Sequence, residues 1–150
     1  MPRRARCGIF LLLIGLAVSC SAKQLAVVVE KGNATSALTS ADLVKILKFQ
    51  TKAWPDGSAI TVVIRDPDSP ELQVALDRLY KTSVDELKAL VTAHKGAIVV
   101  ASSDEDLLRI VGSKHGAVGL VDVYSISHDV KVLKIDGRLP LEAGYLLRGK

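Results

Sequence analysis

Cysteine is nearly absent from this sequence. Cys7 and Cys20 are the only two among 150 residues, so the chain after residue 20 can form no internal disulfide. Only three histidines are present, none at an i, i+4 or His-x-Glu spacing, which gives no support to a zinc-type cluster. The domain must therefore be held together by its apolar core, and we expect neither a metal nor another cofactor.

Sequence motifs of the common enzyme classes are also missing. The chain contains no Gly-x-Ser-x-Gly nucleophile elbow and no Ser-x-x-Lys pair. It has neither a complete G-x-x-x-x-G-K-[ST] phosphate loop nor a G-x-G-x-x-G dinucleotide fingerprint. Its acidic residues gather in the first turns of predicted helices, where they complement the helix dipole. We predict that the protein is not an enzyme and has no catalytic residues.

The longest apolar run, GIFLLLIGLAV at residues 8–18, lies near the start of the chain and follows the basic segment MPRRAR. It is shorter than the roughly 20 residues that a transmembrane helix needs. Its length and basic flank are those of a secretory signal peptide, which we assign to residues 1–22. Residues 23–150 then form the exported domain, in the periplasm or cell envelope.

The end of this segment, LAVSCSA, resembles a bacterial lipobox. This resemblance predicts lipidation of Cys20 and a lipoprotein anchored to a membrane. The alternative is ordinary signal-peptidase cleavage after Ala22, which releases a soluble domain.

The basic balance of the whole chain comes largely from this segment. The sequence has 20 Lys and Arg against 16 Asp and Glu. Arg3, Arg4 and Arg6 lie in the signal peptide, which leaves 17 basic and 16 acidic residues in the remainder. A nearly neutral domain gives no indication of a nucleic-acid partner.

Strand and helix patterns alternate along the rest of the chain. Continuous apolar or β-branched runs predict buried strands, and residues at i, i+3 and i+4 spacing after Ser, Thr or Asp predict capped helices. This predicts an α/β fold, a single domain with a mainly parallel sheet flanked by helices. The predicted strands lie within residues 25–33, 59–65, 117–123 and 130–137, with 97–102 a short strand or an extended connection; the predicted helices lie within 38–50, 69–80, 82–96 and 102–116.

Trp54, the only tryptophan, lies in a Trp-Pro-Asp-Gly turn. Such a residue can serve as an exposed recognition group. We favour the alternative, in which the indole anchors the turn against the domain body.

The segment VVIRDPDSPELQVAL, residues 62–76, carries the candidate binding site. A buried strand ends at Arg65, and a helix starts after Ser69. Helix N-termini bind anions through free backbone N–H groups. The candidate anion-binding groups are therefore Arg65, the Ser69 hydroxyl and the Glu71 backbone.

The same residues also have a purely structural interpretation, which we place first. Ser69 is a good N-cap and Pro70 a good first helical residue. Asp66, Asp68 and Glu71 bring negative charge to this joint, and Arg65 can pair with a neighbouring aspartate.

Two longer phrases resemble the small periplasmic-binding-protein-like (type 2) proteins related to phosphate ABC transporter substrate-binding proteins. The first is Phe49 to Gly57, similar to F-x-G-K-x-x-x-W-P-D-G with threonine in place of the glycine. The second is Ser103 to Glu105 followed by Gly116 to Val121, similar to S-D-E and G-A-I-G-Y-V. The resemblance extends over about residues 25–136.

This resemblance implies a type-2 periplasmic-binding-protein-like fold in an exported, non-enzymatic protein. In the phosphate-binding members a segment R-x-D-x-S-G-T closes on the oxyanion, and Arg65 and Ser69 match its arginine and serine. Pro67 replaces the aspartate, and Pro70 and Glu71 replace the Gly-Thr pair.

We therefore expect a solute-binding-type protein for phosphate or another small anion, as part of or derived from an ABC transporter system. The alternative is an envelope interaction or sensory module that binds another membrane or envelope protein and no small molecule.

Overall fold

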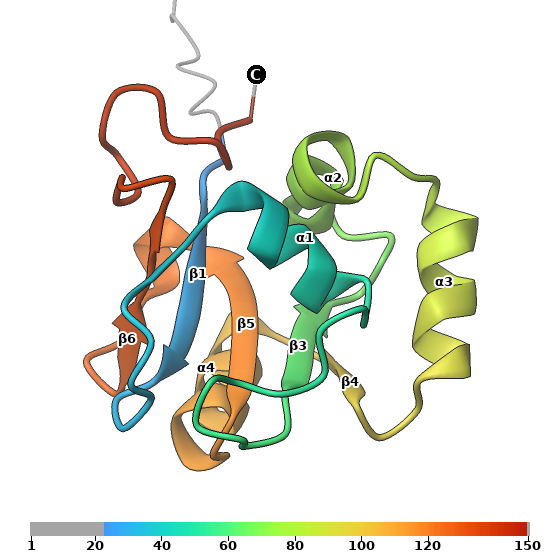
Figure 1. The fold of residues 1–150 in the computed structure, drawn as a ribbon. Helices are drawn as coiled ribbons and strands as arrows, with labels where there is room; N and C mark the ends of the chain where they lie inside the picture. The colour runs from blue at the N-terminus through green and yellow to red at the C-terminus, as the bar shows by residue number, and fades with distance from the viewer. Residues whose placement is uncertain (1–22, 150) are drawn as a thin grey trace, which may run out of the picture.

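The computed structural model describes residues 23–149, so the predicted signal peptide and the lipidation site Cys20 lie outside the described residues. Its centre is a five-stranded sheet with the order β4-β3-β5-β1-β6 (Figure 1). A second sheet of two parallel strands joins β2 to β7. The strands are β1 (Leu25–Glu30), β2 (Ala37–Leu38), β3 (Thr61–Arg65), β4 (Ile98–Ala101), β5 (Ala117–Asp122), β6 (Val130–Val132) and β7 (Lys134–Ile135).

Four of the five central strands run in the same direction. β3 pairs in parallel with both β4 and β5, whereas β1 runs antiparallel to its neighbours β5 and β6. The prediction of a mainly parallel sheet is confirmed, with β1 as the exception. Because β1 is reversed, its first residue, Leu25, lies opposite Asp122 at the carboxyl end of β5. The chain therefore enters the domain at the edge where the other four strands end.

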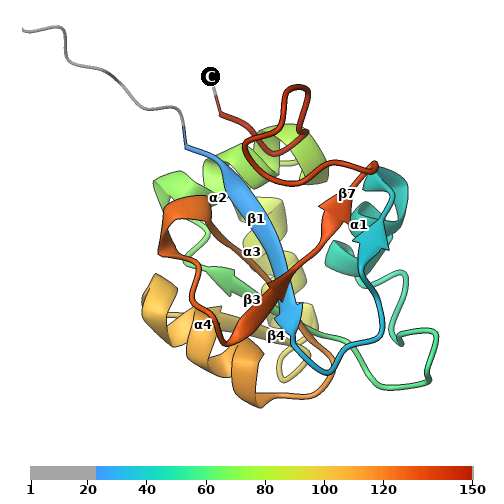
Figure 2. The same cartoon turned by 90° about the vertical axis from the view of Figure 1, so that its left-hand side faces the viewer.

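Helices cover both faces of the sheet (Figures 1 and 2). Alternate strand residues enter two separate cores, with Val62 and Ile64 in one and Val63 in the other. The first core receives the apolar sides of α1, α2 and α3, and the second receives Leu107, Leu108 and Val111 of α4. The helices are α1 (Ser40–Leu47), α2 (Pro70–Ala75), α3 (Val84–Ala93) and α4 (Asp104–Ser113), with a π-helical turn at Leu76–Tyr80 and a 3₁₀ turn, η2, at Val123–Ser125.

Several element boundaries differ from those predicted. α1 ends at Leu47 instead of Gln50, because Phe49 takes a left-handed conformation with φ 59° that stops the helix. The helix predicted for residues 69–80 widens into the π-helical turn after α2. The last predicted strand is two strands, β6 and β7. The buried Leu133 lies between them, where the chain passes from one sheet to the other.

Trp54 anchors its turn, as predicted. Its side chain is buried, and its indole N–H donates to the carbonyl oxygen of Gly116 at 2.9 Å. The turn itself closes through the Gly57 amide, which donates to the Trp54 carbonyl at 2.8 Å. The bond from Trp54 to Gly116 holds this turn, which precedes β3, against the amino end of β5. This is the opposite edge of the sheet from the candidate site.

Candidate functional site

The candidate site lies where the carboxyl ends of β3 and β4 meet. Arg65 is the last residue of β3 and lies opposite Ala101, the last residue of β4, because the two strands pair in parallel. The chain leaves β3 toward α2 on one face of the sheet and leaves β4 toward α4 on the other. In open α/β sheets the usual ligand position is at the carboxyl ends of strands whose connections diverge in this way.

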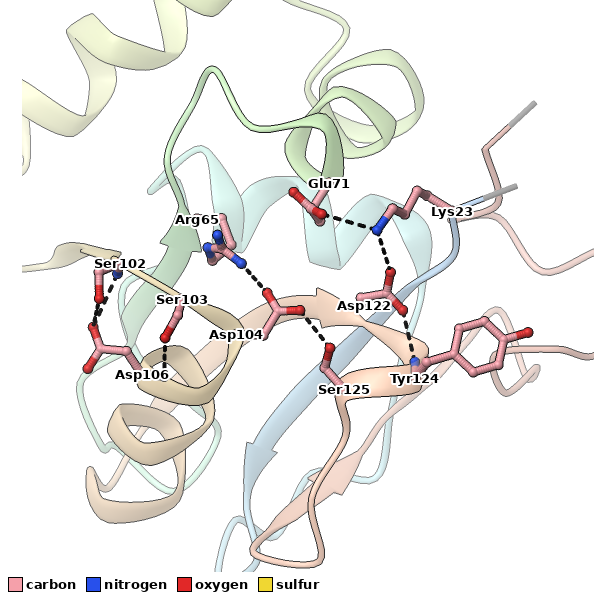
Figure 3. A network of polar contacts seen from close by, with 10 residues as sticks. All are labelled: Lys23, Arg65, Glu71, Ser102, Ser103, Asp104, Asp106, Asp122, Tyr124 and Ser125. Atoms are coloured by element: carbon pink, nitrogen blue, oxygen red, sulfur yellow. Dashed lines mark hydrogen bonds and ion pairs between the residues drawn. The ribbon is translucent and has the colours of Figure 1, made fainter. Parts of the chain in front are cut away.

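Arg65 forms an ion pair at these strand ends with Asp104, the first residue of α4 (Figure 3). Nη1 of Arg65 donates to Oδ1 of Asp104, and the two side chains are each 21% exposed. The other carboxylate oxygen, Oδ2, accepts from the Ser125 hydroxyl at 2.6 Å. Asp104 therefore joins β3 to the 3₁₀ turn that follows β5, and its negative charge compensates the guanidinium.

The segment from Arg65 to Ser69, which connects β3 to α2, is the β3–α2 joint. Two donors at this joint have no hydrogen-bond partner within residues 23–149. They are Nε of Arg65 and the hydroxyl of Ser69, and both atoms are buried. A buried donor without a partner is costly, at about 1–3 kcal/mol. The same condition is found at the hydroxyls of Tyr80 and Tyr145, whereas Arg65 and Ser69 are only four residues apart in the chain.

Ser69 has the position of a helix cap but not its hydrogen bond. It precedes α2 with an extended backbone, and Pro70 is the first helical residue, as predicted. The expected capping bond is absent, however. No N–H of α2 donates to the Ser69 hydroxyl. The joint is closed instead by backbone atoms, as the Ser69 amide donates to the Asp66 carbonyl at 2.8 Å.

The aspartates next to Arg65 in the sequence point elsewhere. Asp66 accepts from the amide of Asp68 at 2.9 Å, within its own turn. Asp68 pairs with Lys88 of α3 at 2.8 Å. The expectation that Arg65 pairs with a neighbouring aspartate of its own turn is therefore wrong, because its partner is Asp104, 39 residues further along the chain.

A second ion-pair network lies beside the first and includes Glu71. Nζ of Lys23 lies 3.2 Å from a carboxylate oxygen of Glu71 and 3.2 Å from one of Asp122 (Figure 3). The hydrogen bonds that Lys23 donates to these carboxylates, to Asp122 first and then to Glu71, raise the pKa of Lys23. Asp122 is buried and also accepts from the Tyr124 amide at 2.9 Å. The Glu71 side chain is thus turned toward Lys23, while its backbone lies in the first turn of α2, after a proline that has no N–H.

The N-terminus of α4 is closed by its own side chains. The Asp106 amide donates to the Ser103 hydroxyl at 3.0 Å, and Asp106 in turn accepts from the Ser102 amide at 3.2 Å. Hydrogen bonds from Arg109 and then from Ser102 lower the pKa of Asp106. Two of the amides at this end of α4, those of Ser102 and Asp106, are therefore bonded to side chains of the same segment.

A groove of about 860 Å³ starts at Asp104 and Ser125 and follows α4. One side is formed by α4 residues such as Leu108 and Gly112, and the other by Ser127 and neighbouring residues of the chain before β6. Arg65 is not among the lining residues, whereas Asp104 is. A ligand arriving through the groove would meet the Asp104 carboxylate first.

Of the predicted site residues, Arg65 ends β3 and Ser69 directly precedes α2, each with a buried donor that has no partner within residues 23–149, and Glu71 lies in the first turn of α2. Sequence analysis does not identify Asp104 and Ser125 as site residues, because it places Asp104 in a helix start and in a family-like S-D-E phrase without assigning it a partner. The available clue was positional. Asp104 follows the strand next to β3, and the carboxyl ends of parallel neighbours meet at the same edge. No group of three or more His, Cys, Asp or Glu that could hold a metal occurs among residues 23–149.

Comparison with known proteins gives matches only at the level of structure. No protein-family model matches the chain, and no curated protein matches it significantly. Solved structures similar to it include an ABC-type phosphate transport receptor from Vibrio cholerae. That match has a TM-score of 0.73 and 22% sequence identity over 86% of this chain and 55% of the receptor.

Two further structures show the same likeness. PstS from Borrelia burgdorferi has a TM-score of 0.73 and 15% identity over 87% of this chain and 56% of that protein. A putative phosphate ABC transporter substrate-binding protein from Clostridium perfringens, solved with bound phosphate, has a TM-score of 0.66 and 16% identity over 78% of this chain and 46% of that one. The expected periplasmic-binding-protein-like fold is confirmed. The chain spans about half the length of these proteins.

Proposed function

We propose that this protein is an exported, non-enzymatic solute-binding-type protein that takes phosphate or another small oxyanion at the β3–α2 joint, as part of or derived from an ABC transporter system. The observation that carries the proposal is the pair of buried donors without partners, Nε of Arg65 and the hydroxyl of Ser69. A tetrahedral oxyanion offers acceptors to both, in charge-assisted hydrogen bonds. The likeness in fold to proteins described as phosphate receptors supports the same assignment.

The position of Asp104 defines how the anion would bind. Nη1 of Arg65 is taken by Asp104, whereas Nε is vacant, so an anion can accept from Nε without breaking the ion pair. The carboxylate nevertheless offsets the charge of Arg65 and repels a second anion nearby. We therefore expect weak binding, in the millimolar range of about −4 kcal/mol.

Thermal unfolding in phosphate, with chloride at matched ionic strength as the reference, tests this proposal. Phosphate at millimolar concentration should raise the midpoint of the wild-type protein. Ser69→Ala should reduce that shift and Arg65→Ala abolish it. Arg78→Ala is a matched control, because Arg78 is an exposed arginine on the π-helical turn at Leu76–Tyr80. No shift in the wild-type protein would refute anion binding and favour an interaction module without a small-molecule ligand.

Export and lipidation form the second part of the proposal. They rest on residues 1–22, whose apolar run and lipobox-like end lie outside the described structure. Within residues 23–149 no helix is long and apolar enough to cross a bilayer. Cys20→Ser should release the protein from membranes into the soluble envelope fraction. Unchanged membrane association of this variant would contradict lipidation at Cys20.

A further inference from the structure

We propose that the end of the domain where the chain enters β1 is a membrane-contacting surface, which rests on lipid through Tyr124, Leu139 and Leu141. This surface is distinct from the anion-binding joint and does not depend on it. Only four large apolar side chains are exposed among residues 23–149, and three of them are these. The fourth, Val100, lies on the edge strand β4.

The segments that carry Tyr124 and Leu141 are both hydrogen-bonded to one residue at the chain entry, Gln24, and Leu139 lies two residues before Leu141. The amide of Val123, next to Tyr124, donates to the Gln24 carbonyl at 3.0 Å. The amide of Leu141 donates to Oε1 of Gln24 at 3.1 Å. Residues 117 apart in the chain thus meet at the start of β1, where the C-terminal loop and the η2 turn lie on either side of the strand (Figure 2).

Leu141 is the most informative member of this surface. It has a φ of 73°, in the left-handed region that is unfavourable for a leucine. Its side chain is nevertheless 60% exposed, and that of Tyr124 is 74% exposed. A strained backbone that presents an apolar side chain to solvent indicates a binding role.

Basic residues border the apolar group. The backbone of Arg148 forms an isolated antiparallel β-bridge with that of Gln24. Arg138 donates through Nη1 to the carbonyl of Ala143, in the same loop as Leu141. Neither arginine has a carboxylate partner within residues 23–149. Tyrosine and leucine beside arginine is the composition of segments that lie in a bilayer interface and attract anionic headgroups.

The inference that the occupant is lipid rests on the lipidation of Cys20 proposed above. The apolar run at 8–18 and the candidate lipidation site Cys20 come directly before Lys23. An extended chain from residue 20 to residue 23 reaches only about 10 Å. A domain held to a bilayer through Cys20 must therefore keep this end close to the headgroups.

Depth-dependent quenching on the full chain tests the proposal, and the absence of cysteine after residue 20 makes single labels specific. Leu141→Cys and Tyr124→Cys variants carry a bimane fluorophore and are reconstituted in 3:1 phosphatidylethanolamine–phosphatidylglycerol vesicles containing lipid with a nitroxide near the headgroup. Lys114→Cys is the control, because Lys114 is exposed at the opposite edge of the sheet, just before β5. The unsubstituted protein, labelled in the same way, corrects for Cys7 and Cys20.

Quenching should be several-fold stronger at positions 124 and 141 than at 114, and Arg138→Glu with Arg148→Glu should reduce it in vesicles that contain phosphatidylglycerol. Equal quenching at 141 and 114 on vesicle-bound protein overturns the proposal. A full chain that stays in solution also overturns the proposal. Disulfide cross-linking of unlabelled Leu141→Cys between two copies overturns it as well, and would assign the surface to self-association. None of these readouts involves phosphate, so their failure leaves the anion-binding test unaffected.

Discussion

Arg65 and Asp104 are 39 residues apart in the chain and form an ion pair across the carboxyl ends of two parallel strands. The pair places a carboxylate at the guanidinium that an incoming anion would need. Asp104 also lines the groove beside α4, whereas Arg65 does not. The site therefore contains its own competing anion, and the strength of ligand binding depends on how firmly Asp104 holds the arginine.

Replacing Asp104 should strengthen anion binding. Asp104→Asn keeps an acceptor for the Ser125 hydroxyl but removes the charge that compensates Arg65. We expect a phosphate-dependent rise in unfolding temperature larger than that of the wild-type protein, together with a loss of about 1–3 kcal/mol in stability without ligand. Thermal unfolding with and without phosphate measures both effects. A smaller phosphate shift than in wild type would show that Asp104 assists binding instead of competing with it.

The Ser69 hydroxyl should contribute little to stability without ligand. It makes no capping bond, whereas the Ser83 hydroxyl accepts from the Glu86 amide at 3.2 Å in a complete capping box. We expect Ser69→Ala to change the free energy of unfolding by only a few tenths of a kcal/mol, and the matched Ser83→Ala to cost about 1 kcal/mol. Urea unfolding compares the two. Equal losses would mean that Ser69 does cap α2 and is not held vacant for a ligand.

Gly116 should be far less tolerant of substitution than Gly57, although both have positive φ. A Cβ on Gly116 would lie 2.2 Å from the Ala59 carbonyl oxygen, whereas a Cβ on Gly57 meets nothing within 4 Å. Gly57→Ala should therefore cost only the backbone strain, about 1–2 kcal/mol. Gly116→Ala should cost at least about 2 kcal/mol more. The clash with Ala59 also displaces the carbonyl of residue 116 itself, which accepts from the Trp54 indole. Chemical unfolding of both variants, with tryptophan fluorescence as the probe, tests the difference.

Tyr80 should make the protein sensitive to alkaline pH. Its side chain is buried and its hydroxyl has no partner within residues 23–149, so burial raises the pKa of Tyr80. Because the folded state keeps the proton more tightly than the unfolded state, stability is complete below the ordinary tyrosine pKa of about 10. Above it, stability falls by about 1 kcal/mol per pH unit.

Tyr80→Phe should reduce this alkaline slope while leaving stability at pH 7 unchanged or higher, since a buried unpaired hydroxyl is removed. Tyr145, whose pKa burial also raises, keeps part of the slope. Tyr124→Phe, at an exposed position, is the control. An identical pH profile for Tyr80→Phe and wild type would contradict the assignment.

The sequence was sufficient to predict features that depend on local order. The capping box at Ser83, the anchored turn of Trp54 and the helix start at Pro70 all follow from residues a few positions apart. The direction of β1 could not be predicted, because a continuous apolar run shows burial on both faces and says nothing of strand direction.

The partner of Arg65 was not predicted for a related reason, because the positional clue to Asp104 requires the strand order to be known. Three carboxylates stand within six residues of it, at Asp66, Asp68 and Glu71, yet each is engaged elsewhere. Only the strand order β4-β3-β5 brings Asp104 and Ser125 to the arginine. A site built across strand ends is determined by topology, and one chain read in order does not contain that information.

The reversed direction of β1 has a consequence for how the polypeptide closes on itself. The Gly149 amide donates to the Lys23 carbonyl at 2.7 Å, and the Leu25 amide donates to the Leu147 carbonyl at 2.9 Å. The two ends of the described chain are thus joined side by side, and the path between them is almost a ring. A short linker from 149 to 23 with new termini opened at the exposed 55–58 turn should give a circular permutant with the same fold. Such a permutant would move the start of the chain to the opposite edge of the sheet from the anion-binding joint.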